Sequence, residues 1–437
     1  MPKITMDLIQ GILYGNGLHI GKLSPSGRVM ATMMGRNADV VPFMGPQIHD
    51  HAMTVAKVPA QRYYFDANLL VDVHIAVDRW YGFDSYTIIP DTYNFEVEAL
   101  GAKFIYSDNA MPTVDTNHPL INERTDLDKI GPLDPSKGRI AMGAELAGLI
   151  SKKASGPFAA GFFCSPFSLL CQAMGYPKVV RAIKRDRVYA QELFDWAENE
   201  AIWPYVKAQS EAPGVTQSVG ADAWAAFPNL TPDLVDEWIV PSAKRLAQRG
   251  KKELGITIMA GLAAADYCEE DPEKFNKEIM FKCWATARKT FFMDVAFSGM
   301  GRTEDWDMNW LQEFAVQNGK GSRKLPIYAS LNGRFTRDST PDQIFAKVRE
   351  WIDIMGRDGR VLFFIGNVPA DTPPINVHCA LYAVHTLGKY PIAKNLDAIK
   401  LEPPRFQPFD EWLKGQPEEE IILKAREWKP KDKKVFA

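Results

Sequence analysis

The chain has 437 residues, of which 46% are hydrophobic and 24% charged, so it can bury a large core and wholesale disorder is excluded. Its 51 Lys and Arg against 54 Asp and Glu give a formal net charge of -3, which offers no basic field for nucleic acid or an anionic membrane. The 5 cysteines form no CxxC pair, which disfavours a disulfide framework or a zinc finger and indicates a reducing, cytoplasmic location.

Neither the N-terminal residues nor the longest uncharged stretch indicates a membrane protein. The first residues lack the basic-then-apolar layout of an export signal. The longest uncharged stretch, residues 156–175, is interrupted by prolines and polar side chains, which favours a buried strand running into a buried helix over a membrane span. We therefore expect a soluble protein.

Eight short apolar runs recur along the chain, each followed by a stretch with helical periodicity. Runs that are apolar throughout are typical of parallel strands covered on both faces. The runs are residues 39–44, 85–90, 158–164, 215–222, 255–261, 291–297, 325–331 and 361–366. Eight such units predict an α/β fold, a single distorted (β/α)8 barrel domain with a core over about residues 28–395.

Three local patterns refine this prediction. The connection over residues 91–157 is too long for a bare loop, and its segments 103–106 and 112–114 predict an inserted hairpin beside the barrel mouth. Thr-Pro-Asp-Gln at residues 340–343 supplies an N-cap, a first-turn proline and a capping-box glutamine, and so predicts a helix start. The proline-rich, charged residues 396–437 predict a C-terminal arm that wraps the barrel.

The catalytic candidates follow the first two runs, because a barrel places its active site at the carboxyl ends of its strands. His49 and His51 would point to one side of an extended loop, as metal ligands or a proton shuttle do; alternatively one caps a helix and the other is solvated. Asp91 is the first polar group after the second run and should project into the mouth, with Glu98 on the same face of a following helix. Such carboxylates can act as acids or bind a cation, although Asp91 can also cap that helix.

The substrate-binding candidates lie at other strand ends. Asn332 and Asn367 are neutral hydrogen-bonding groups for a polar substrate, although asparagine beside glycine also favours a turn. Trp224 and Tyr93 suit a flat, apolar substrate, although aromatic side chains more often serve packing. His118 follows the hairpin and can fold back toward the second strand end; a solvated surface histidine is the alternative. The sequence contains neither a phosphate loop nor GxSxG, which disfavours nucleotide cofactors and serine hydrolases.

Six short motifs occur in a fixed order. They are Asp39-Val-Val-Pro-Phe, Ile89-Pro-Asp91, Glu98-Ala-Leu-Gly-Ala, Gly220-Ala-Asp-Ala-Trp224, Thr340-Pro-Asp-Gln-Ile and Gly366-Asn-Val-Pro-Ala-Asp-Thr-Pro-Pro374. This ordered set, over about residues 28–390, resembles the uroporphyrinogen decarboxylase superfamily, which includes the corrinoid-dependent methyltransferases. The resemblance implies a distorted (β/α)8 barrel with its cleft at the carboxyl ends of the strands.

The chain departs from both branches of that superfamily. Asp91 matches the aspartate that binds the pyrrole N–H groups in the decarboxylases, but their arginine-rich N-terminal signature is absent, and Ala223 and Asn367 fall where the family has a serine and a histidine. A substrate rich in carboxylates needs those cations. The H-x-C zinc motif of thiol-methylating members is also missing at Met259-Ala-Gly261, so a zinc or other divalent metal is left open without support from the motif.

The resemblance therefore implies a methyltransferase that demethylates a small methylated donor, most simply an O-methyl ether, and passes the methyl group to the cobalt of a corrinoid. No D-x-H-x-x-G motif occurs, so the corrinoid (cobalamin) would be carried by a partner protein docking at the barrel mouth. The leaving oxygen needs a proton donor or Lewis acid. The candidates for that catalytic role are Asp91, Glu98, His49 and His51, and those for substrate binding are Asn332, Asn367, Trp224, Tyr93 and His118. A cofactor-free, decarboxylase-like lyase and a non-catalytic binding member are the alternatives, and the oligomeric state is left open.

Overall fold

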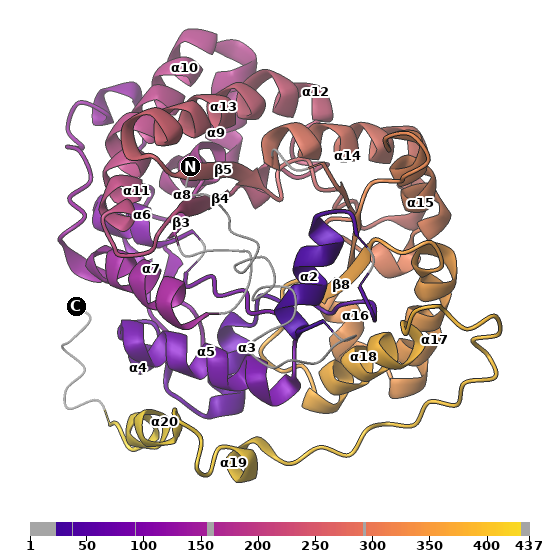
Figure 1. Cartoon of the computed structure of the whole chain (residues 1–437). Helices are drawn as coiled ribbons and strands as arrows, with labels where there is room; N and C mark the ends of the chain where they lie inside the picture. The colour runs from indigo at the N-terminus through magenta and orange to yellow at the C-terminus, as the bar shows by residue number, and fades with distance from the viewer. Residues whose placement is uncertain (1–22, 37, 92, 155–160, 292–293, 430–437) are drawn as a thin grey trace.

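The computed structural model describes residues 23–36, 38–91, 93–154, 161–291 and 294–429. Residues 1–22, on which the expectation about an export signal rests, lie outside the described residues, as do the first residues of the third apolar run, two residues of the sixth run and the charged end of the arm. The helices form an outer ring around the strands (Figure 1).

The elements have the following bounds. The strands are β1 (Phe104–Ile105), β2 (Thr113–Val114), β3 (Gly161–Cys164), β4 (Gln217–Ala221), β5 (Thr257–Leu262), β6 (Ala296–Phe297), β7 (Ile327–Leu331) and β8 (Val361–Ile365). The helices are α2 (Pro25–Met33), α3 (His49–Ala56), α4 (Ala60–Tyr63), α5 (Ala67–Tyr81), α6 (Phe95–Ala99), α7 (Ala141–Lys153), α8 (Pro166–Met174), α9 (Tyr176–Arg185), α10 (Arg187–Trp196), α11 (Trp203–Ser210), α12 (Pro232–Leu234), α13 (Val240–Arg249), α14 (Lys277–Phe291), α15 (Met308–Gln317), α16 (Gly333–Asp338), α17 (Pro341–Trp351), α18 (Pro374–Leu387), α19 (Phe409–Trp412) and α20 (Glu419–Arg426).

Two parallel sheets form the inner layer, in the orders β3-β4-β5 and β6-β7-β8. The first two apolar runs form only single parallel bridges, from Phe43 to Phe363 of β8 and from Met44 to Ser85. Pro42 and Pro90 lie in these runs and have no N–H to donate to a ladder, which explains why the runs do not become longer strands. The molecule is an α/β fold of parallel strands and surrounding helices, consistent with the expected barrel. Among the described residues, no ladder pairing joins β5 to β6 or the second run to β3.

Several local predictions are confirmed. The segments around residues 104 and 114 form the antiparallel hairpin β1–β2. The helix start at Thr340 has the full capping box with Gln343. The described part of the uncharged stretch folds as β3 and α8, and every residue of β3 is buried. Within the described part of the chain, each helix is too short or too polar to span a bilayer.

Two terminal segments close the molecule. Helix α2 lies beside β8 inside the ring (Figure 1), where Val29 packs in one cluster with Val295, Tyr328 and Leu362 at the amino-terminal ends of β6, β7 and β8. At the other end of the chain, α19 and α20 pack against α3 and α5 along the lower edge of that view. The arm is held there by polar contacts such as Trp80 Nε1 to the backbone oxygen of Gln407, at 2.8 Å.

Candidate functional site

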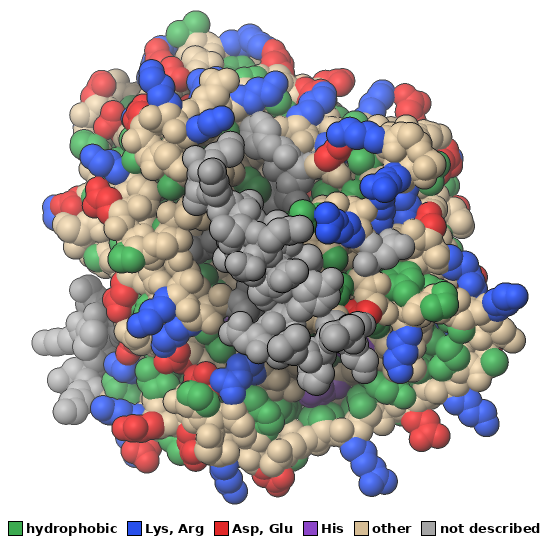
Figure 2. Space-filling model, in the orientation of Figure 1, with side chains coloured by type: hydrophobic (Ala, Val, Ile, Leu, Met, Phe, Trp, Pro, Cys, Tyr) green, Lys and Arg blue, Asp and Glu red, His purple; other side chains and the backbone are tan. Residues whose placement is uncertain are grey.

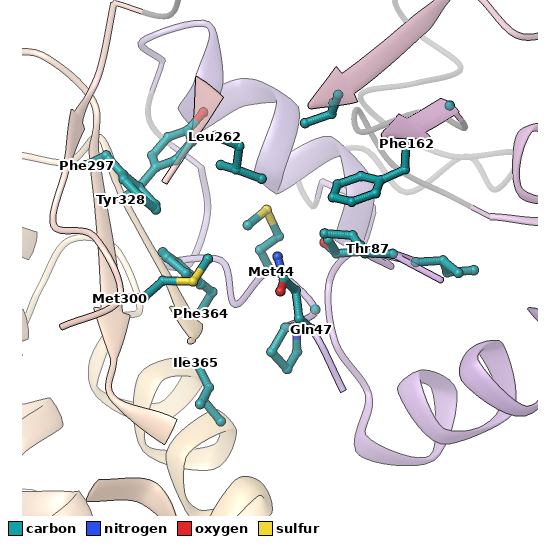
Figure 3. Close-up of a pocket in the computed structure, with 16 residues that line it drawn as sticks. Met44, Gln47, Thr87, Phe162, Leu262, Phe297, Met300, Tyr328, Phe364 and Ile365 are labelled. Carbon is teal, nitrogen blue, oxygen red and sulfur yellow. The ribbon is translucent and has the colours of Figure 1, made fainter. Parts of the chain in front are cut away.

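A cavity occupies the axis of the strand layer. Its empty volume is about 770 Å³, part of which is open to solvent. The cavity extends from the middle of the strands, at Phe162 and Val219, to their carboxyl ends, at Leu262 and Ile365. Figure 3 shows the labelled side chains of several strands converging on this space. Helix α2 packs over the amino-terminal ends of β6, β7 and β8, on one side of the opposite end.

The wall of this axial cavity is apolar and uncharged. Its described polar side chains are those of Gln47, Thr87 and Tyr328. The hydroxyl oxygens of Thr87 and Tyr328 are buried, and no described group hydrogen-bonds to either. At the outer end Leu262 and Met300 are only partly buried, so a bound molecule could be reached from outside. A cavity of this kind suits a small apolar ligand with one hydrogen-bonding atom.

A second, narrower cavity, called the branch cavity below, adjoins the axial cavity between β5 and β6, where the ladder is interrupted. It has an empty volume of about 390 Å³ and shares Leu262, Phe297 and Tyr328 with the axial cavity. The carboxyl group of Asp266, four residues after β5, lines this branch. Asp266 is 3% exposed, and the main-chain N–H of Met300 donates to its carboxyl group. The same carboxyl group thus faces a cavity and links the loops that follow β5 and β6.

Asp91 and Glu98 lie close together because both carboxyl groups bind the same arginine, which the sequence did not indicate. Arg139, just before α7, donates from Nη1 to Asp91 Oδ2 at 2.6 Å and from Nε to Glu98 Oε2 at 2.6 Å. Asn94 and Tyr106 donate to the remaining oxygens of Asp91 and Glu98. Burial raises the pKa of Asp91, and the adjacent Arg139 opposes that shift. The side chain of Asp91 therefore turns toward Arg139 and is absent from the described lining of the axial cavity, contrary to the expected projection into the mouth.

The extended loop predicted for His49 and His51 is wrong, because both residues lie in the first turn of α3. Residues two apart on a helix point in nearly opposite directions. His49 interacts with the backbone of Ile89 and Pro90, whereas His51 Nε2 lies 2.6 Å from the hydroxyl of Tyr81. Burial lowers the pKa of His51 to about 4. The two imidazoles therefore do not converge on a shared ligand.

The residues proposed for substrate binding are dispersed. Asn332 accepts from the N–H groups of Arg334 and Phe335 and so caps α16, while Asn367 is exposed in the same outer hollow. Trp224 is 38% exposed and stacks on Tyr176, and the hydroxyl of Tyr93 accepts from Ala223 N at 3.3 Å. His118 is exposed and hydrogen-bonded to Asp115 instead of folding back onto Glu98. None of these five candidate side chains is in the described lining of the axial cavity.

The described residues offer no metal site, because no three His, Cys, Asp or Glu side chains among them are grouped closely enough to hold an ion. The residues that sequence reasoning missed are Arg139, Asp266, Thr87 and Tyr328. For Asp266 a signal existed: it is the first charged residue after the fifth apolar run, which is the rule that selected Asp91. For Arg139 there was none, because its partners are distant in sequence.

Comparisons with known proteins agree with this architecture. The model of the uroporphyrinogen decarboxylase (URO-D) family matches residues 24–387, so the chain belongs to that family of enzymes, as its motifs predicted. Among solved structures, a methyltransferase from Methanosarcina mazei shares the fold, with a TM-score of 0.59 and 18% sequence identity over 83% of this chain and 98% of that chain. No curated protein matches the chain in sequence.

Proposed function

We propose that this chain is a methyltransferase that demethylates a small O-methylated donor and passes the methyl group to the cobalt of a corrinoid carried by a partner protein. The observation that carries the proposal is the axial cavity, which is uncharged and apolar and reaches residues at the carboxyl ends of the strands. Family membership and the fold shared with the Methanosarcina mazei methyltransferase support it. A decarboxylase-like lyase is less well supported, because a substrate rich in carboxylates needs cations and none lines the described wall.

The roles of this chain's residues follow from the wall. Phe162, Phe297 and Phe364 bind the apolar body of the donor and exclude water. The unpaired hydroxyls of Thr87 and Tyr328 orient an ether oxygen by hydrogen bonding. The partly exposed, uncharged rim fits the approach of a corrin face, and the corrinoid, when docked, supplies a cobalt(I) nucleophile. No step is assigned to zinc, because the described residues do not provide its ligands.

Methyl transfer is the test. The protein is incubated with cob(I)alamin and methyl aryl ethers such as methoxybenzene, and methylcobalamin and the released phenol are measured. We expect both products in equal amounts. Val219→Phe should fill the cavity and abolish transfer, while the matched Val219→Ala should raise KM with little effect on folding. Absence of transfer from ethers, amines and methyl halides, together with carbon dioxide release from a tetrapyrrole, contradicts the proposal.

One observation favours a second candidate, a non-catalytic binding protein. Neither a carboxylate nor a histidine belongs to the described wall of the axial cavity itself, so the acid that ether cleavage requires must come from elsewhere. A binding protein would take up methoxybenzene, as measured by calorimetry, without releasing phenol in the presence of cob(I)alamin.

A further inference from the structure

The branch cavity holds an acid that the proposed function has not used. Asp266 is almost fully buried, and no described group hydrogen-bonds to its Oδ2. Its carboxyl group lies against the backbone of Gly299, where an added Cβ would come within 3.1 Å of Asp266 Cγ. Leu262, Phe297 and Tyr328 line both this cavity and the axial cavity, so the two spaces adjoin. Among the described residues, Asp266 is the carboxyl group that lines the cavity adjoining the proposed donor site.

The loop that carries Asp266 is conformationally strained. Ala263 and Ala265, both with side chains, have φ angles of 66° and 62°, a left-handed conformation that costs about 1–2 kcal/mol per residue. Gly261, at the end of β5, has a φ of 98°. Strain of this kind is retained where a particular placement is needed, and it clusters at functional sites. Here it directs the loop so that Asp266 enters the gap between β5 and β6.

We propose that Asp266 is the proton donor of the methyl transfer, giving its carboxyl proton to the oxygen that leaves the methylated donor. This inference rests on the proposed function. The methyl carbon–oxygen bond breaks with its electron pair on oxygen, and the proton from Asp266 converts that oxygen to a hydroxyl. The methyl group would pass to the corrinoid held by the partner, which would supply the electron pair for the new bond. Asp266 is left as a carboxylate and regains a proton from water.

The protonation state of Asp266 suits this role. Burial raises the pKa of Asp266 to about 7, so the carboxyl group still holds a proton near neutral pH. Burial also raises the pKa values of Tyr93, Cys268 and Cys283, the other titratable groups that interact with it, so they stay neutral. Arg288 of α14 lines the same branch but is paired with Asp294. Asp266 is thus the group around this branch that titrates near pH 7.

A structural role is the competing explanation, because Asp266 also accepts from Met300 N. Asp266→Asn keeps an oxygen for that contact and removes the acidic proton. Asp222→Asn is the matched control: Asp222 is equally buried and has its pKa raised to about 7, but it accepts from Ser168 N and lines neither cavity in the described structure.

The experiment measures kcat for methyl transfer from methoxybenzene to cob(I)alamin between pH 6 and 9. For the unmodified protein we expect kcat to fall above pH about 7, as Asp266 ionises. Asp266→Asn should lower kcat about 100-fold and remove this pH dependence, while KM is retained and the unfolding midpoint is not lowered. Asp222→Asn should keep both kcat and the pH dependence. The inference is overturned if Asp266→Asn keeps the pH-dependent limb or if Asp222→Asn abolishes it.

A second readout is independent of turnover. Infrared difference spectra should contain a protonated carboxyl band that disappears on titration through pH 7; we expect the part of this band that is lost in Asp266→Asn but kept in Asp222→Asn to shift when phenol binds. If the protein transfers no methyl group yet this band shifts with phenol, the proposed function fails while Asp266 still contacts the ligand oxygen. If transfer occurs and the band does not shift with phenol, the inference about Asp266 fails and the proposed function stands.

Discussion

Buried carboxylates gather in two regions of the strand layer, and the regions differ in what faces the charge. After the second apolar run, Asp91 and Glu98 share the guanidinium of Arg139. After β4 and β5, Asp222 and Asp266 are 0% and 3% exposed and have only backbone and hydroxyl donors. A buried carboxylate beside a cation can stay ionised, whereas one without a cation holds its proton to a higher pH. Proton-transfer chemistry is therefore expected at Asp266, which lines the branch cavity, and structural charge pairing at Asp91 and Glu98.

The largest expected effect tests the charge pairing. Arg139→Met should lower the free energy of unfolding by about 3–5 kcal/mol, because it leaves two carboxylates without their buried cation. Urea unfolding at pH 7 measures this. Arg334→Met is the control, since Arg334 and Glu270 are exposed at 70% and 67%, and the loss there should stay within about 0.5 kcal/mol. Similar losses in both variants would show that the Arg139 group is not a buried ion cluster.

Neutral amides should have effects of different size in the two regions. Burial raises the pKa of Asp266 to about 7 in the folded protein, whereas an unperturbed aspartate has a pKa of 3.8. The free energy of unfolding therefore falls as the pH rises from 3.8 to about 7, because the unfolded chain releases this proton first. Asp266→Asn removes the buried charge, so at pH 8.5 it should raise the free energy of unfolding by about 2–4 kcal/mol. At pH 4 it should have little effect.

Asp91→Asn, measured at the same pH 8.5, should raise the free energy of unfolding by less than Asp266→Asn does, because burial raises the pKa of Asp91 but the adjacent Arg139 opposes that shift. Chemical unfolding at both pH values measures the two variants side by side. Equal gains from the two substitutions at pH 8.5 would mean that the cation does not distinguish the regions.

The fold was predictable from local patterns, except for the strand pairing of the first two apolar runs. Continuous apolar runs selected β3 to β8, since strands buried on both faces carry no polar alternation. The capping signals at Thr340 needed only neighbouring residues and were equally predictable. The runs ending at Met44 and Pro90 were correctly placed but form single bridges, because hydrogen bonding between strands depends on tertiary register as well as on composition.

The site was less predictable, because side-chain direction and pairing are tertiary properties. Chain order shows that Asp91 follows a strand, but only the fold brings Arg139 to it. The prediction that His49 and His51 point to the same side assumed an extended backbone, in which alternate side chains share a face. Both residues lie on a helix, where side chains two positions apart point in different directions. Asp266 shares the sequence signal of Asp91 but lies four residues past its strand, within a small-residue loop that resembles a connector.

A smaller effect is expected at the neutral side chains that follow β7 and β8. Asn332→Ala should lower the free energy of unfolding by about 1 kcal/mol, because its oxygen caps α16 and its amide donates to Gly301 O at 2.9 Å. Asn367→Ala, at an exposed position, should change it by less than about 0.5 kcal/mol. Thermal unfolding resolves the two. Equal losses would place Asn367 in a contact that the structure does not contain.

The smallest effect is expected at the exposed edge of the first region. His118 is bonded to Asp115, which lines the same surface hollow as Glu98 and Arg139. Because the His118 side chain is 57% exposed, His118→Ala should shift the unfolding midpoint by less than about 1 °C and leave methyl transfer unchanged. A loss of transfer in His118→Ala as large as that in Val219→Phe would mean that the donor binds in this surface hollow. The acid would then have to be Glu98 or Asp91, and the contrast between the two regions would be reversed.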